Sequence, residues 1–161
     1  MAQKVTKITR VPTHNGDTGL VLDFPEKASA TFAEGDLVVT TAGQIDECGA
    51  DPAKVLGIAL KAKTGTTNSM IPVLVIRPGD VFLMPFLAAD TFAVADHGVS
   101  YGVTTPSAGR WEVDTAETTA DVVVVLGSPE RNAETGALAA TAGGPVFVSF
   151  ISTVLEFGTA D

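Results

Sequence analysis

The chain of 161 residues is long enough for one domain with its own core, and it is short for two independently stable halves. Its formal net charge of −9 should repel phosphate backbones, and no cluster of Lys or Arg offsets this charge locally, so the composition argues against partners such as nucleic acid or an anionic membrane. Charged residues make up 18% of the chain, below the typical value of about 25%, which indicates either an apolar surface that meets a partner or an Ala- and Val-rich domain that needs few charges.

Cysteine usage and the N-terminal segment bear on the compartment. Cys48 is the only cysteine, so an intrachain disulfide is excluded and folding in a reducing compartment is expected. The basic residues near the N-terminus are not followed by an apolar segment of the kind found in secretory signals, and no apolar run approaches the ~20 residues that span a bilayer. We therefore expect a protein made in the cytoplasm that has no membrane partner.

The first residues predict an extended arm that leads into a hairpin. Residues 1–12 contain Thr and Pro between their apolar residues, which is unfavourable for helix, so we expect an extended N-terminal arm. Lys4, Lys7 and Arg10 give this arm a positive charge within an acidic chain. An Asn-Gly turn follows at Asn15, and a strand is expected over 20–24.

The next segments predict a second hairpin and then a change of chain direction. Strands over 36–41 and 44–47 flank a two-residue turn. Asp51 followed by Pro52 predicts a single helical turn, since Asp accepts backbone N–H bonds as a cap and Pro fits the first helical position. Alternation of apolar residues then predicts a half-buried strand over 55–62.

The segment 70–76 is apolar at both alternating sets of positions, which predicts a strand covered on both faces. Pro72 cannot donate to a ladder, so this pattern favours an edge strand at a subunit contact. For residues 86–95, periodicity leaves a short helix and an irregular crossover open. The remaining strands are expected over 81–86, 98–105, 110–114, 122–126 and 146–155, the last segment as one long strand or two short ones. Residues 127–144 are Ala- and Gly-rich, and they predict a long loop or a partly ordered excursion.

About ten short strands with frequent turns predict a single all-β domain over residues 1–161, a small antiparallel β-barrel or β-sandwich with little helix. The pairs Gly35-Asp36 and Gly79-Asp80 each stand directly before a strand. Glycine permits a positive φ and aspartate bonds to nearby backbone, so both pairs predict structural turns into a strand. The two Gly-Asp pairs are explained better as a common type of turn that occurs twice than as an internal repeat.

Catalytic, cofactor and metal sites have little support in the sequence. His14 and His97 are the only histidines, whereas a transition-metal site normally needs three or four ligands. The acidic stretch 46–51 lacks the ligand spacing of a helix–loop–helix calcium site, and the acids beside Cys48 should raise the thiol pKa. We therefore expect no catalytic residues, no cofactor and no metal, and a small hydrolase is the weakest alternative.

Several segments within roughly residues 28–114 together resemble the head decoration (cement) proteins of tailed bacteriophages. The segments that carry this resemblance are 28–38 (ASATFAEGDLV), 46–52 (DECGADP), 55–59 (VLGIA), 71–76 (IPVLVI), 78–80 (PGD), 98–103 (GVSYGV) and 111–114 (WEVD). The resemblance implies a non-enzymatic β-domain that assembles, often as a homotrimer, on the outer surface of a viral capsid and stabilises it. Its partners would be the major capsid protein and copies of itself, and its location would be the virion.

Two further hypotheses follow from this reading. The arm carrying Lys4, Lys7 and Arg10 could lie on an acidic shell surface, and a frayed terminus is the equally weighted alternative. Another virion β-module, such as a tail or fibre component, or a carbohydrate-binding domain remains an alternative function. Aromatic residues are only 6% of the chain, with Trp111 and Tyr101 alone of their kinds, which disfavours a sugar-stacking platform.

Overall fold

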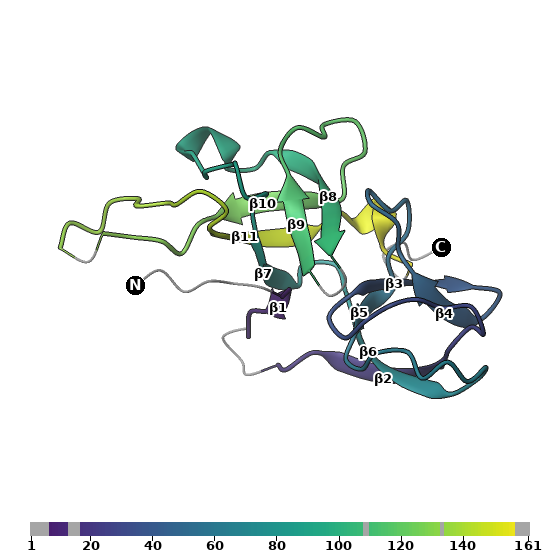
Figure 1. Cartoon of the computed structure of the whole chain (residues 1–161). Helices are drawn as coiled ribbons and strands as arrows, with labels where there is room; N and C mark the ends of the chain where they lie inside the picture. The colour runs from purple at the N-terminus through teal and green to yellow at the C-terminus, as the bar shows by residue number, and fades with distance from the viewer. Residues whose placement is uncertain (1–6, 13–16, 108–109, 133, 157–161) are drawn as a thin grey trace.

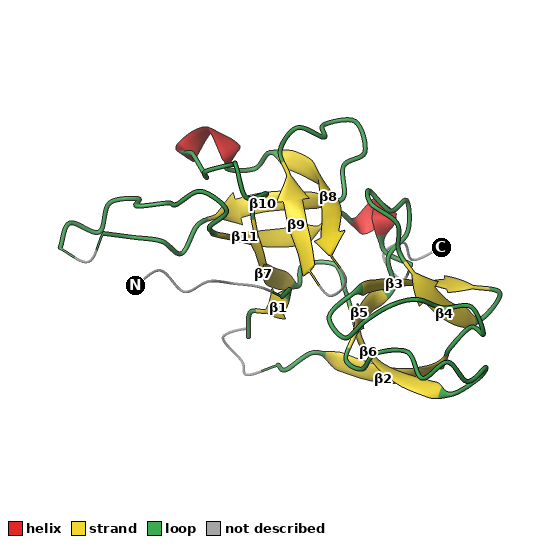
Figure 2. Ribbon diagram, viewed as in Figure 1, coloured by secondary structure: helices red, strands yellow, loops and turns green. Residues whose placement is uncertain are grey.

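The fold is all-β, built from two antiparallel sheets that lie one above the other in Figure 1. The computed structural model describes residues 7–12, 17–107, 110–132 and 134–156. Within these residues the only helices are two 3-10 turns, η1 (Val94–Asp96) and η2 (Ser152–Val154), drawn in red in Figure 2. Neither is long and apolar enough to cross a membrane.

The strands divide between the sheets in nearly sequential blocks. The first sheet contains β2 (Leu20–Pro25), β3 (Leu37–Thr41), β4 (Gln44–Glu47), β5 (Gly57–Ala59) and β6 (Met70–Val75). The second contains β1 (Thr9–Arg10), β7 (Val81–Pro85), β8 (Ser100–Ser107), β9 (Arg110–Asp114), β10 (Val123–Gly127) and β11 (Pro145–Phe150). Most of the expected strands are present, and the hairpin of β3 with β4 is confirmed.

The two sheets repeat one structural unit. The first has the order β2-β6-β5-β3-β4, and the second has β7-β11-β10-β8-β9, with β1 added outside β7. The strands that correspond are therefore β2 with β7, β3 with β8, β4 with β9, β5 with β10, and β6 with β11. In each unit a parallel bridge joins the two ends of the strand order. Glu26, directly after β2, is bridged to Ile45 in β4, and Phe86, directly after β7, is bridged to Val113 in β9. A single bridge therefore connects the segment after β2 with β4, and the segment after β7 with β9.

Register and sequence support this internal repeat. Leu22 pairs with Val73 in the first unit, and Phe82 pairs with Val148 at the corresponding position of the second. Five residue pairs are identical when positions 25–33 are placed on 85–93: Pro25 and Pro85, Ala28 and Ala88, Thr31 and Thr91, Phe32 and Phe92, and Ala33 and Ala93. Turn dipeptides do not reveal this repeat, because the identical residues are dispersed among differing ones.

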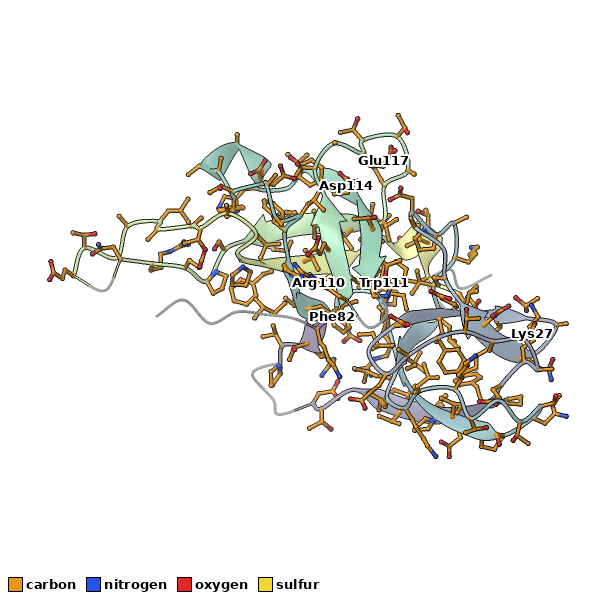
Figure 3. All side chains as sticks on the ribbon, viewed as in Figure 1. Lys27, Phe82, Arg110, Trp111, Asp114 and Glu117 are labelled. Atoms are coloured by element: carbon orange, nitrogen blue, oxygen red, sulfur yellow. The ribbon has the colours of Figure 1, made fainter. Side chains whose placement is uncertain are left out.

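The units share a core. One buried cluster contains Leu37 and Ile58 from the first unit together with Phe82 and Val148 from the second. A smaller cluster lies inside the first unit alone. At the junction the indole N–H of buried Trp111 donates to Oδ1 of Asp36 over 3.0 Å. Figure 3 shows Trp111 near the end of β9 that faces the first sheet.

Several expectations about local structure were wrong. The strand expected over 55–62 is shorter, and its three residues in β5 are all buried. The strand expected over 146–155 ends at Phe150, and residues 152–154 form η2 instead. The arm and the strand after it form no hairpin, because β1 pairs with β7 and β2 pairs with β6; the turn proposed at Asn15 lies outside the described residues. β6 is an internal strand between β2 and β5. Its Pro72 is tolerated because it lies opposite Leu60, one residue beyond the end of β5 at Ala59, so the missing N–H removes no bond of the β5–β6 ladder. Asp51 begins no helical turn, since its φ of 48° lies in the left-handed region.

The crossover over 86–95 is irregular and ends in η1. Much of the described part of 127–144 is a long loop that projects from the body, at the far left of Figure 1. An isolated bridge joins Arg131 to Leu138 within it.

Candidate functional site

The basic residues of the N-terminal arm are engaged within the chain. Nη2 of Arg10 lies 2.7 Å from Oδ1 of Asp80, and both side chains are almost fully buried. Asp17 pairs with Arg77 over 2.6 Å and joins the same network. Lys7 pairs with Glu34 over 3.1 Å at the surface. Arg10 therefore anchors β1 to the body, whereas the Lys7 ammonium remains exposed to solvent.

Lys4 lies outside the described residues, so the structure places only two of the three arm cations. An exposed ion pair such as that of Lys7 contributes little to stability and exchanges readily with a competing charge. Of the described arm residues, Lys7 is the one whose charge could be offered to a partner.

The two Gly-Asp turns have the same hydrogen bonds. Gly35 and Gly79 have φ values of 94° and 85°, which an L-residue with a side chain rarely adopts. Oδ2 of Asp36 accepts the N–H of Ala33, and Oδ2 of Asp80 accepts the N–H three residues before it. The other oxygen of each carboxylate binds a distant side chain, Trp111 for Asp36 and Arg10 for Asp80. These turns tie together parts of the fold that are remote in sequence.

The groups considered for chemistry are separately engaged. Burial and nearby carboxylates raise the pKa of Cys48 to about 12, so the thiol stays protonated at neutral pH. Nδ1 of His97 lies 3.0 Å from the carbonyl oxygen of Leu126, to which it can donate, and the ring packs edge-on against Phe92. No group of three His, Cys, Asp or Glu side chains in the described part of the chain could hold a metal ion. His14 lies outside that part.

The most distinctive surface lies on the first sheet. Five large apolar side chains there are between 40% and 55% exposed, and we name them the β2 surface: Leu20, Val21, Leu22, Leu60 and Met70. Three come from β2, Met70 begins the neighbouring strand β6, and Leu60 follows β5 and binds β6 through its backbone N–H. Leu20 and Leu22 lie on the same face of the sheet as Val73, whereas Val21, Leu60 and Met70 lie on the opposite face, so the β2 surface comprises both faces of this part of the sheet. Exposed apolar side chains beside a sheet edge are typical of protein–protein contacts.

Sequence reasoning identified β2 as a strand but missed its exposure. The run Leu20-Val21-Leu22 is apolar at both alternating sets of positions, a pattern that also describes a buried strand. Only the sheet order shows that β2 lies at an edge. Comparisons of the chain with models of protein families, with curated proteins and with solved structures found no match.

Proposed function

We propose that the chain is a non-enzymatic structural protein that binds the outer surface of a viral capsid, where it stabilises the shell as a decoration protein. The observation that carries the proposal is the β2 surface, five exposed apolar side chains on the two faces of the first sheet, near its β2 edge. The resemblance of several segments to head decoration proteins supplies the kind of partner.

Assembly on a lattice suits a contact made by only a few side chains of each copy. Copies joined around a symmetry axis bind a repeating surface through several weak contacts at once, and their combined affinity far exceeds that of one contact. The proposed assembly is a homotrimer, and the proposed partner is the major capsid protein. Lys7 at the base of the arm offers a cation to an acidic shell.

Co-sedimentation with empty shells tests this function. The shells are those formed by the major capsid protein encoded in the same genome, and the purified chain should sediment with them saturably. Val21→Lys should weaken binding by about tenfold or more, because it places a charge in an apolar contact. Val94→Lys is the matched control, since Val94 is 71% exposed on η1, outside the β2 surface. Failure of the wild-type chain to sediment with the shells would contradict the proposal.

A further inference from the structure

The outer edge of β2 has backbone groups without partners among the described residues. In β6, the carbonyl oxygen of Pro72 accepts a hydrogen bond from the N–H of Leu60, so the backbone groups of Pro72 point toward β5. The backbone groups of Ile71 and Val73, the residues on either side, therefore point toward β2, where they pair with Phe24 and Leu22. The N–H and C=O groups of Val21 and Asp23 therefore point away from the sheet. Neither residue forms a backbone bond outside the β2–β6 pair with any residue that the structure describes.

The internal repeat shows what such an edge accepts. In the second unit, β1 covers the corresponding edge of β7 in antiparallel orientation, and the N–H of Val11 donates to the carbonyl oxygen of Val81 over 2.8 Å. Val81 occupies the position that Val21 has in the first unit. An extended segment thus fills, in one unit, the place that stays open in the other.

The side chains of the two edge strands, β7 and β2, also differ in exposure. Phe82 is fully buried in a cluster that also contains Ile8, the residue before β1. Its counterpart Leu22 is 42% exposed, although it pairs with the fully buried Val73. The core of the first unit is therefore open along β2, where no side chain equivalent to Ile8 covers it in the described structure.

Charge indicates the kind of segment that fits. Asp23 is an exposed carboxylate in the middle of the edge, and it has no hydrogen bond or ion pair with the described residues. The segment that covers the other edge contains Lys7 and Arg10. We propose that the edge of β2 is a strand-acceptor site, at which an extended segment of a partner protein that carries basic side chains adds antiparallel, in the register that β1 has on β7, where Arg10 lies opposite Phe82, the counterpart of Leu22.

This inference deepens the proposed function by naming a contact for the partner, but its test uses the purified chain and no shell. The probe is a synthetic peptide with the sequence of residues 5–12, since the segment 8–11 within it covers the equivalent edge. In the free chain, amide hydrogen exchange should be fast at Val21 and Asp23 and slow at Leu22, whose N–H faces β6. Millimolar peptide should slow exchange at Val21 and Asp23 by tenfold or more.

Variants separate backbone pairing from other contacts. Val21→Pro removes an outward N–H without loss of a bond within the chain, so it should abolish peptide binding while Leu22 stays protected. Val21→Thr keeps the N–H and should bind as the wild type does. Asp23→Lys should weaken binding about threefold. A peptide with Pro in place of Thr9 should not bind.

Three results would overturn the assignment. The first is slow exchange at Val21 and Asp23 in the free chain. The second is an absence of any effect of the peptide on these amides. The third is protection that grows with the concentration of the chain alone, which would make a second copy the occupant. Loss of shell binding with intact peptide binding would count against the capsid function only.

Discussion

The hydrogen bond between Trp111 and Asp36 joins the two units through buried side chains. Both residues are buried, and the carboxylate also accepts the N–H of Ala33 in the turn before β3. One residue therefore shapes a turn in the first unit and holds the indole of the second. A hydrogen bond to a charged group at such a site contributes more than a neutral one.

Trp111→Phe should lower the free energy of unfolding by about 2 kcal/mol or more, through loss of the indole N–H and of packing volume. Urea unfolding of the wild type, Trp111→Phe, Asp36→Asn and the double variant would measure this change and the coupling between the two residues. The two losses should be clearly smaller in combination than their sum. Strict additivity would show that the bond does not link the units.

Glutamates clamp loops through a shared geometry. Glu26, fully buried, accepts both the N–H and the hydroxyl of Thr64. Glu130 binds the same two groups of Thr141, and Glu156 binds those of Thr40. Burial by itself would raise the pKa of Glu26, but hydrogen bonds from the 64–66 backbone and the Thr64 hydroxyl lower it overall.

The sign of the pH effect follows from this lowered pKa. The stabilisation from Glu26 is complete above its ordinary value of 4.5 and is lost as pH falls through the lower value of the folded state. Glu26→Gln should cost about 2 kcal/mol at neutral pH and should flatten the stability profile below pH 4.5. Unfolding titrations from pH 3 to 7 would show this. Glu34→Gln, at an exposed pair, should leave the profile nearly unchanged; an unaltered profile for Glu26→Gln would contradict the clamp.

At the scale of elements, close approach of β5 and β6 depends on one glycine. A Cβ at Gly57 would collide with the carbonyl oxygen of Leu74, a backbone atom that cannot move without disturbing the ladder. Gly57→Ala should therefore cost about 3 kcal/mol, as thermal unfolding would show. Gly49→Ala is the control, because nothing lies within 4 Å of its added Cβ and its φ is not positive. Equal stability of the two variants would exclude this explanation.

The sequence predicted the positions of the strands better than it predicted which strands pair with one another. Alternation and turn residues predicted β3, β4 and β9 within a residue of their observed ends. Pairing between β1 and β7 joins residues about seventy positions apart, and no local pattern specifies it. The edge position of β2 is equally non-local, so its apolar run could be identified as a strand but not as an exposed surface.

At the scale of the whole molecule, the repeat explains why one edge is covered and the other open. Natural sheets protect long apolar edges, commonly with charged residues or with a covering strand. The second unit has a covering strand in β1, whereas the first, in the part of the chain that the structure describes, has only the charged Asp23 in the middle of its edge. The two units thus have unequal roles, and the first presents the surface that we assign to a partner.

Sedimentation equilibrium of the purified chain at micromolar concentrations tests the account most directly, because it asks whether this β body assembles. The account predicts a stable species of three chains, each of 16.5 kDa. A single chain throughout the concentration range, without binding to shells, would contradict it.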